Sequence, residues 1–197
     1  MTILQNVIEA PVQVLKIPRQ EAIDRATMYL EKVGIPDKLE AYPAHLSGGQ
    51  QQRAALARAL VLQPKVLLLD EPLSNLDAHL RDEMRELILS IQRSLGVTTI
   101  FVTHDQEEAV LLADRIALMF DGKIQQIGRS RLFYEKPASR RIAAFFGNNN
   151  FLEGFKENQL VSSRVGSFRI ESGSPDGPVV LVIRPESIVL GDGATNS

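Results

Sequence analysis

The chain has 197 residues, of which 44% are hydrophobic and 23% are charged, and it contains no cysteine. This composition excludes a disordered or collagen-like chain, and also excludes disulfides, thiolate metal sites and thiol nucleophiles. The 22 basic residues are offset by 24 acidic ones. The net charge of -2 argues against a broad basic face, so we expect no nucleic-acid partner. The apolar runs, such as those at 66–69 and 179–183, are far shorter than the roughly 20 residues that cross a bilayer.

The first part of the chain has the apolar spacing of three helices. The first of them, kinked or interrupted at Pro11, is predicted to bury a face made of Leu4, Val7, Ile8, Val14 and Leu15. The second ends at Gly34 and is predicted to bury Ala22, Ile23, Ala26, Leu30 and Val33. The third follows Ser47, ends before Pro64 and carries Ala54, Leu56, Ala57, Leu60 and Val61.

From residue 66 onward the pattern alternates between strands and helices. The wholly apolar run at 66–69 predicts a strand buried on both faces of a parallel sheet. A helix capped by Asp77 follows and ends at Gly96, and the β-branched run at 98–103 predicts a second strand. Asp105 then caps another helix. This order predicts an α/β fold.

The C-terminal part is predicted to begin with a hairpin and to end in a small β region. Asp121-Gly122 separates two apolar runs and is a strong hairpin signal. Helical turns are expected around 132–134 and 142–146. Beyond residue 148 lie six of the 13 glycines and no convincing helix, only short β-like pieces at 168–170 and 179–183. We therefore expect a domain boundary near residue 148.

Residues 46–53, Leu-Ser-Gly-Gly-Gln-Gln-Gln-Arg, combine a helix-capping serine with two glycines. Ser47 caps the helix, and Gly48 and Gly49 leave the first N–H groups of the helix open to a ligand. A helix start with exposed donors suits phosphate. For Ser-Gly-Gly alone, a capped turn with flexible glycines is the simpler alternative, but the whole octet is far more specific.

Two adjacent carboxylates, Asp70 and Glu71, follow the first predicted strand. The carboxyl ends of parallel strands are where open α/β sheets place their ligands. We expect Asp70 to hold Mg²⁺ directly or through water, and Glu71 to orient and deprotonate an attacking water. An acidic loop after a core strand is the alternative.

His104 follows the second predicted strand. From there its ring can reach the neighbouring strand end and donate a hydrogen bond to a phosphoryl oxygen, although a single histidine at a strand end is more often structural. A phosphate-binding helix start, a carboxylate pair and a strand-end histidine together predict a nucleoside triphosphatase.

These segments resemble, in order and spacing, the motifs of the ATP-binding subunits of ABC transporters. Residues 46–53 match the signature motif, 66–72 are similar to the Walker B strand, 73–77 to the D-loop and 102–105 to the switch-histidine segment. Residues 73–147 resemble the importer subclass that handles polyamines, sulfate, ferric iron or sugars. The asparagine run at 148–150 and residues 151–154 and 183–186 look like pieces of its appended TOBE domain.

The resemblance implies a partial P-loop NTPase body with a helical subdomain and a small, incomplete all-β TOBE-like appendage. Residues 1–45 would begin the helical signature subdomain, 46–147 would run through the ATPase core from signature to switch histidine, and 148–197 would form the partial TOBE-like domain. In the family, residues matching 2–33 also dock a helix of the membrane subunit, although core packing alone explains the same apolar faces.

The implied activity is ATP hydrolysis coupled to solute uptake, with ATP and Mg²⁺ as cofactors. Glu71 and His104 would be catalytic and Asp70 would bind Mg²⁺. ATP held by a second ATPase subunit would face Ser47, Gly48, Gly49 and Gln50, together with Asp77 of the D-loop. The other implied partners are membrane permease subunits, which places the chain peripherally at the cytoplasmic face of the cell membrane.

One family motif has no counterpart in this chain. No G-x-x-x-x-G-K-[ST] phosphate loop occurs, and the only Gly-Lys pair, Gly122-Lys123, lies in the predicted hairpin turn. In the family this loop precedes the helical lobe, so we expect the chain to be a fragment whose Met1 matches an internal methionine. Without the loop we expect the chain alone neither to bind nor to hydrolyse ATP appreciably.

Two other function classes remain as alternatives. The first is a non-catalytic interaction protein that completes or blocks a partner's ATPase site through its signature motif. The second is an ABC-type ATPase of chromosome maintenance or DNA repair, which shares the signature and Walker B motifs. A coiled coil usually separates the halves of those proteins, whereas here a D-loop and TOBE-like tail follow directly, so this class is disfavoured.

Overall fold

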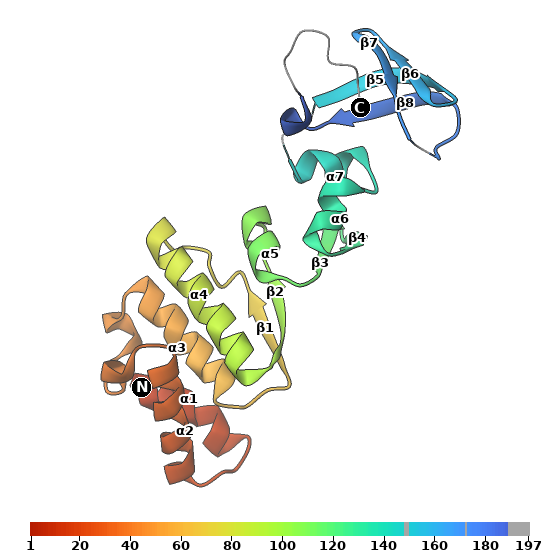
Figure 1. Ribbon diagram of the computed structural model, residues 1–197. Coiled ribbons are helices and arrows are strands. Elements are labelled where there is room, and N and C mark those ends of the chain that lie inside the picture. Colours follow the sequence, from red (N-terminus) through yellow and green to blue (C-terminus); the bar gives the residue numbers. More distant parts are fainter. Residues whose placement is uncertain (148–149, 172, 189–197) are drawn as a thin grey trace. The chain divides into compact units, whose positions relative to one another are not determined.

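The computed structural model describes residues 1–147, 150–171 and 173–188. It divides into two compact units, Met1–Ala113 and Asp114–Ser197 (Figure 1). The predicted boundary near residue 148 lies inside the second unit and stays a prediction about domain identity. None of the described helices combines the length and apolar character that crossing a bilayer requires.

The first unit begins with three helices, which are joined by two short 3₁₀ turns. These elements are α1 (Ile3–Gln13), α2 (Arg19–Lys32), η1 (Pro36–Lys38), η2 (Pro43–His45) and α3 (Gly48–Leu60). Polar side chains cap the N-termini of two of these helices, since Thr2 forms a capping box at α1 and Ser47 forms one at α3. The three predicted helices are therefore confirmed.

The C-terminal end of α1 differs from the prediction. Pro11 lies inside the helix and is buried, and the helix ends two residues later at Gln13. Val14 and Leu15 are 73% and 46% exposed, so the prediction that they share the buried face is wrong. The physical reason is that the chain leaves the helix and turns through Lys16, whose φ is +56°.

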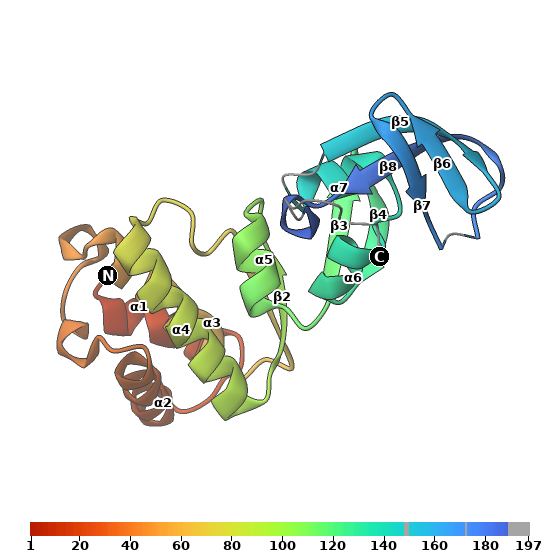
Figure 2. The ribbon, with the colours of Figure 1, turned by 45° about the horizontal axis from the view of Figure 1, so that its top comes forward.

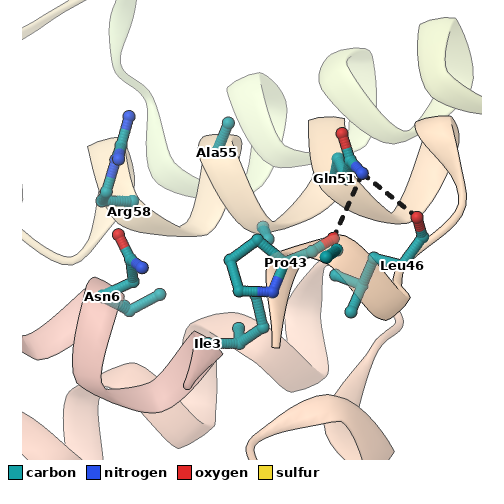
Figure 3. Close-up of a pocket in the computed structure, with 10 residues that line it drawn as sticks. Ile3, Asn6, Pro43, Leu46, Gln51, Ala55 and Arg58 are labelled. Atoms are coloured by element: carbon teal, nitrogen blue, oxygen red, sulfur yellow. Dashed lines mark hydrogen bonds between the residues drawn. The ribbon is translucent and has the colours of Figure 1, made fainter. Parts of the chain in front are cut away.

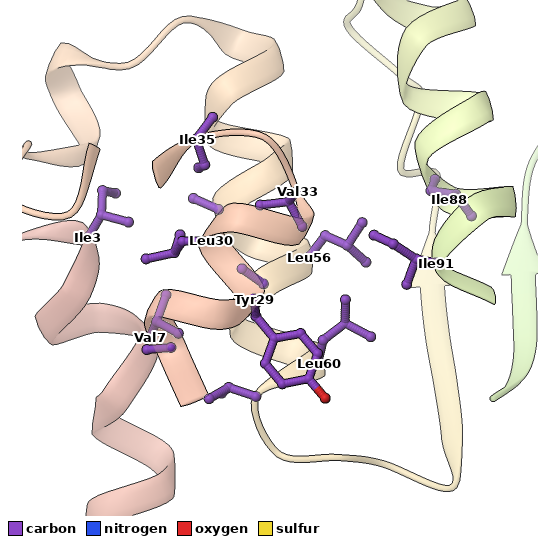
Figure 4. Close-up of a cluster of buried hydrophobic side chains, with 14 of the residues drawn as sticks. Ile3, Val7, Tyr29, Leu30, Val33, Ile35, Leu56, Leu60, Ile88 and Ile91 are labelled. Atoms are coloured by element: carbon purple, nitrogen blue, oxygen red, sulfur yellow. The ribbon is translucent and has the colours of Figure 1, made fainter. Parts of the chain in front are cut away.

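The core of the first unit lies between these helices and α4 (Ala78–Leu95). Figure 4 shows side chains from α1, α2 and α3 converging, with Ile88 and Ile91 of α4 on the adjoining side. Most of the predicted inward residues are buried there, including Leu30, Val33 and Leu60. Tyr29 is also buried, at 4% exposure, which the apolar pattern did not predict.

A β-α-β unit follows the three helices. The strands β1 (Val66–Asp70) and β2 (Thr98–Val102) are parallel, and α4 connects them. Asp77 caps α4, and Gly96 ends it in the left-handed conformation at φ +60°. Figures 1 and 2 show α4 running alongside α3, and a short helix, α5 (Gln106–Leu112), follows β2.

The predicted burial of the first strand is only half right. Leu67 and Leu69 are 4% and 8% exposed and belong to the helical core, whereas Val66 and Leu68 are 52% and 64% exposed. A strand that is apolar on both faces is therefore packed on one face only. The reason is that no described element of this unit covers the second face, so the prediction of burial on both faces is wrong.

The second unit begins with the predicted hairpin, formed by β3 (Ile116–Phe120) and β4 (Lys123–Gly128). Asp121 and Gly122 both have positive φ, at +52° and +72°, as a two-residue type I′ turn requires. Two short helices follow, α6 (Ser130–Glu135) and α7 (Arg140–Phe145).

An antiparallel sheet of four strands completes the described part of this unit. Its spatial order is β7 (Gly166–Arg169), β6 (Leu160–Ser163), β5 (Asn150–Glu157) and β8 (Gly177–Ile183), and the turn η3 (Pro185–Ser187) follows. The sequence predicted pieces of β7 and β8 but neither β5 nor β6. Arg184 joins the sheet to the helices, since its guanidinium lies 3.7 Å from the ring centroid of Tyr134 and donates to the carbonyl oxygen of Phe146.

Candidate functional site

The carboxyl ends of the two parallel strands bring Glu71 and His104 together. The register pairs Asp70 with Val102, so the residues that follow each strand leave the sheet at the same edge. His104 Nδ1 lies 3.1 Å from Glu71 Oε1, and both side chains are open to solvent, at 77% and 47% exposure. The structure thus joins two predicted site residues that are 33 positions apart in sequence.

The chemistry of this pair follows from its donors and acceptors. An ionised carboxylate only accepts hydrogen bonds, so the contact with Glu71 requires a His104 ring that carries a hydrogen on Nδ1. The other ring nitrogen, Nε2, forms no hydrogen bond with any described residue. The pair therefore presents a carboxylate that can accept a proton and a ring nitrogen that can contact a ligand.

The backbone of Glu71 is held in an unusual conformation. Its φ is +44°, in the left-handed region that side-chain-bearing residues rarely adopt. Its N–H donates to the carbonyl oxygen of Val102 at 2.9 Å, and its own carbonyl accepts from the N–H and hydroxyl of Ser74, at 3.1 and 2.8 Å. Glu71 is thus fixed on one side by the neighbouring strand and on the other by the following loop.

The backbone around His104 is fixed by a second hydrogen-bonded group. The Thr103 hydroxyl donates to Oε2 of Glu108 at 2.6 Å and accepts from the N–H of Asp105 at 2.9 Å. The carboxylate of Asp105 caps α5 by accepting from the N–H groups of Glu107 and Glu108. Neither Thr103 nor Glu108 was predicted from the sequence to belong to the site. The available signal was a polar residue at the end of the strand, Thr103, with an acid five positions later, Glu108.

Asp70 projects from the same edge with its carboxylate unengaged. It is exposed and forms no hydrogen bond or ion pair with the residues that the structure describes. Within residues 1–147, 150–171 and 173–188, no group of three or more His, Asp or Glu side chains is placed to hold a metal ion. A single free carboxylate does fit Mg²⁺, because that ion usually keeps several waters and takes its remaining ligands from substrate phosphates.

The signature helix begins with the predicted cap. Ser47 Oγ accepts from the N–H of Gln50 at 3.3 Å, and Oε1 of Gln50 accepts from the N–H of Ser47 at 3.1 Å. The N–H groups of Gly48 and Gly49 have no partner among the described residues, and a Cβ added at Gly48 would meet nothing within 4 Å. Gly48 is exposed, but Gly49 is buried beside the Leu80 side chain, so the prediction that both glycines lie open is confirmed for Gly48 and wrong for Gly49. The exposed part of the helix start fits a phosphate group.

The rest of the octet braces this helix start. Gln51 donates through Nε2 to the carbonyl oxygens of Pro43 and Leu46, each at 3.1 Å, beside a pocket of about 270 Å³ (Figure 3). Arg53 donates to the carbonyl oxygen of Val33 at 2.9 Å and pairs with Glu83 at 3.1 Å. These bonds attach the signature helix to the preceding turn, to the end of α2 and to α4.

Asp77, which was predicted to face nucleotide, has a structural task here. Its Oδ1 accepts from the N–H of Leu80 at 2.9 Å and caps α4. No hydrogen bond or ion pair between described residues joins Ser47 or Gln50 to Glu71 or His104. The chain thus presents two groups of predicted site residues that are not bonded to one another.

Comparisons with known proteins agree with these motifs. The family model described as "ABC transporter" matches residues 1–74. The Fe(3+) ions import ATP-binding protein FbpC of Fusobacterium nucleatum is 44% identical over 199 residues, which cover 99% of this chain and 53% of that protein. The chain is thus similar, along nearly its whole length, to ATP-binding proteins of ABC importers.

Other relatives extend this result. The trehalose/maltose import ATP-binding protein MalK of Thermococcus litoralis is 44% identical over 202 residues, covering 95% of this chain and 54% of that protein. The solved structure of cbiO1 from Clostridium perfringens, part of the ABC transporter complex cbiONQ, has a TM-score of 0.62 and 33% identity. That match covers 73% of this chain and 57% of that one, and the chain has the mixed α/β fold of these ATPases.

The extent of the match limits what it implies. The chain spans about half the length of the curated relatives it matches, 53% and 54% for the two named above. The relatives are import ATP-binding proteins with different named solutes, ferric iron and trehalose or maltose.

Proposed function

We propose that this chain is part of an ABC importer ATPase, in which it supplies a signature helix and the strand-end catalytic group. The observation that carries the proposal is the Glu71–His104 pair at 3.1 Å, open to solvent beside the free carboxylate of Asp70. In this role the chain takes part in coupling ATP hydrolysis to solute uptake. It works peripherally at the cytoplasmic face of the membrane, with a second ATPase subunit and permease subunits.

At the strand ends, each side chain has a separate task. Glu71 accepts a proton from the attacking water, and its left-handed conformation and the bonds from Ser74 to its carbonyl oxygen fix the backbone that carries the carboxylate. His104 orients that carboxylate through Nδ1, and when the ring carries hydrogens on both nitrogens its Nε2–H donates to the terminal phosphoryl group. Asp70 would hold Mg²⁺, which would offset the negative charge of the phosphates.

At the signature helix, the ligand belongs to the partner. The N–H group of the exposed Gly48 and the capping residues Ser47 and Gln50 approach ATP bound by a second subunit, with Gly49 behind them. This chain's own Gly-Lys pair lies in the β3–β4 turn rather than in a phosphate loop. We therefore propose that the chain alone does not bind ATP appreciably and needs a subunit with such a loop. Asp77, the residue that caps the N-terminus of α4, would face the same partner-bound ATP.

An association experiment tests this proposal. The chain is mixed with an intact homologous subunit, whose own catalytic glutamate is replaced by glutamine so that ATP is retained, and sedimentation is measured with and without MgATP. We expect an ATP-dependent complex that Ser47→Arg abolishes and that Ser90→Arg, an exposed serine on α4, leaves intact. No ATP-dependent complex, or equal loss with both variants, contradicts the proposal.

The same mixture separates the second candidate function, an interaction protein without catalysis. The open signature start supports that alternative on its own, because it requires none of the strand-end residues. If this chain completes only the partner's site, the phosphate release of a mixture with unmodified partner will respond to Ser47→Arg but not to Glu71→Gln. A contribution from both residues favours the catalytic role.

A further inference from the structure

Glu108 is a buried carboxylate that the predicted machinery does not use. It lies in the first turn of α5 and is 5% exposed, whereas its neighbour Glu107 is exposed. A buried carboxylate is costly unless hydrogen bonds stabilise it. Among the described residues Glu108 forms no ion pair, and its carboxylate bonds to the hydroxyl of Thr103 at 2.6 Å.

This bond determines how the Thr103 hydroxyl is used. The hydroxyl donates its hydrogen to Glu108, so a lone pair remains to accept from the N–H of Asp105, at 2.9 Å. The two bonds involve the residues immediately before and after His104. They therefore fix the short backbone segment from which the His104 ring reaches Glu71.

We propose that Glu108 is a positioning residue, which acts through Thr103 to hold His104 against Glu71. In this scheme Glu108 does not contact the nucleotide. It acts on His104 through the Thr103 hydroxyl and the backbone between Thr103 and Asp105. The functional meaning of this inference rests on the proposed catalytic role of the Glu71–His104 pair. The geometric part concerns the chain alone and needs neither nucleotide nor partner.

At position 108, the effect of the charge and the effect of the hydrogen bond can be tested with different substitutions. A glutamine there keeps an oxygen that can accept from Thr103, whereas alanine removes the acceptor. At position 103, serine keeps the hydroxyl and valine removes it while preserving the branched shape. Glu108→Gln and Thr103→Ser are thus conservative variants, and Glu108→Ala and Thr103→Val remove the bond from opposite sides.

The three histidines, His45, His79 and His104, allow a direct test by NMR. The imidazole signals of the purified chain are recorded at one fixed pH, with Glu71→Ala defining the unpaired position of His104. We expect Glu108→Ala and Thr103→Val to move the His104 signals in that same direction, and their combination to move them no further. Glu108→Gln, Thr103→Ser and the exposed control Glu107→Ala should leave His104 near its original position, and His45 and His79 should not move in any variant.

A different pattern overturns the inference. If Glu108→Ala lowers the unfolding temperature but leaves His104 unmoved, Glu108 has only a structural role. If all three histidines lose their native signals in Glu108→Ala, that variant is unfolded and Thr103→Val becomes the test. Unmoved His104 signals in Thr103→Val then contradict the proposal. Failure of the ATP-dependent association with normal NMR coupling would count against the proposed function and not against this inference.

Discussion

The signature helix start and the strand-end pair are built in different ways. The capping box joins Ser47 to Gln50, three positions away, whereas the Glu71–His104 contact spans 33 positions and depends on the register of β1 and β2. A local structure persists wherever its helix forms, but a contact across strands is lost when the sheet shifts. We therefore expect the two regions to respond differently to the same perturbation.

The largest expected effect is chemical and concerns only the strand-end pair. When the chain is joined to the preceding portion of an intact relative, Glu71→Gln should lower turnover roughly 10²–10⁴-fold, because the general base is lost. ATP binding should persist, since the phosphate loop in the joined portion is untouched. Phosphate release and nucleotide titration measure the two quantities, with Glu107→Gln as the control. Equal turnover in Glu71→Gln removes Glu71 from the role of base.

The next largest effect concerns the stability of β1, which positions the strand-end pair but not the signature helix start. Leu69→Ala removes a side chain of β1 that is 8% exposed and should lower the free energy of unfolding by about 2–5 kcal/mol. Leu68→Ala, one residue earlier and 64% exposed, should change it little. Urea unfolding gives the stabilities, and in the still-folded protein the His104 signals should move with Leu69→Ala alone. Similar losses in both variants would contradict the one-sided burial of the strand.

A smaller effect is expected at the helix start. Ser47→Ala removes the side-chain acceptor of the capping box and should lower the free energy of unfolding by about 1 kcal/mol. The change is local, so the His104 signals should stay in place. Ser90→Ala on α4 is the matched control. Movement of His104 in Ser47→Ala would mean that the two regions are coupled more closely than their contacts indicate.

The smallest effect on either region should come from the second unit. Lys156 is buried and donates to Asp176 at 3.0 Å, and this hydrogen bond holds the pKa of Asp176 below its usual value of 3.8. A lowered pKa in the folded state contributes stability above the usual value, and that contribution is lost as pH falls through the lowered one.

Asp176→Asn should therefore reduce amide-exchange protection in β5 and β8 near neutral pH. The difference from the unmodified chain should shrink as the pH drops below about 4. Neither Ser47 nor His104 should respond, because both lie in the other unit. A difference that is constant with pH would show that the charge of Asp176 is not responsible.

Much of the fold could be predicted from short-range signals in the sequence. The caps at Ser47, Asp77 and Asp105 and the Asp121-Gly122 turn are all confirmed, because each involves neighbours within a few positions. The errors concern what lies opposite a residue. Val66 and Leu68 were predicted to be buried, but whether a strand face is covered depends on elements distant in sequence.

The candidate site divides in the same way. The capped signature start followed directly from Ser47 and the two glycines, whereas the approach of Glu71 to His104 required a parallel register that the sequence only suggested. Glu108 was missed because an acid in the first turn of a helix is ordinarily explained by the helix dipole at the surface. β5 and β6 were missed because polar and glycine residues interrupt their apolar pattern.

Calorimetric titration of MgATP into the purified chain by itself tests the central claim most directly. The account predicts no saturable heat and no released phosphate, because this sequence contains no phosphate loop to hold the nucleotide beside the strand-end pair, and its signature helix faces only ATP that a second subunit holds. Tight, saturable binding accompanied by turnover would contradict the account, since this chain would then hold and cleave ATP without a partner.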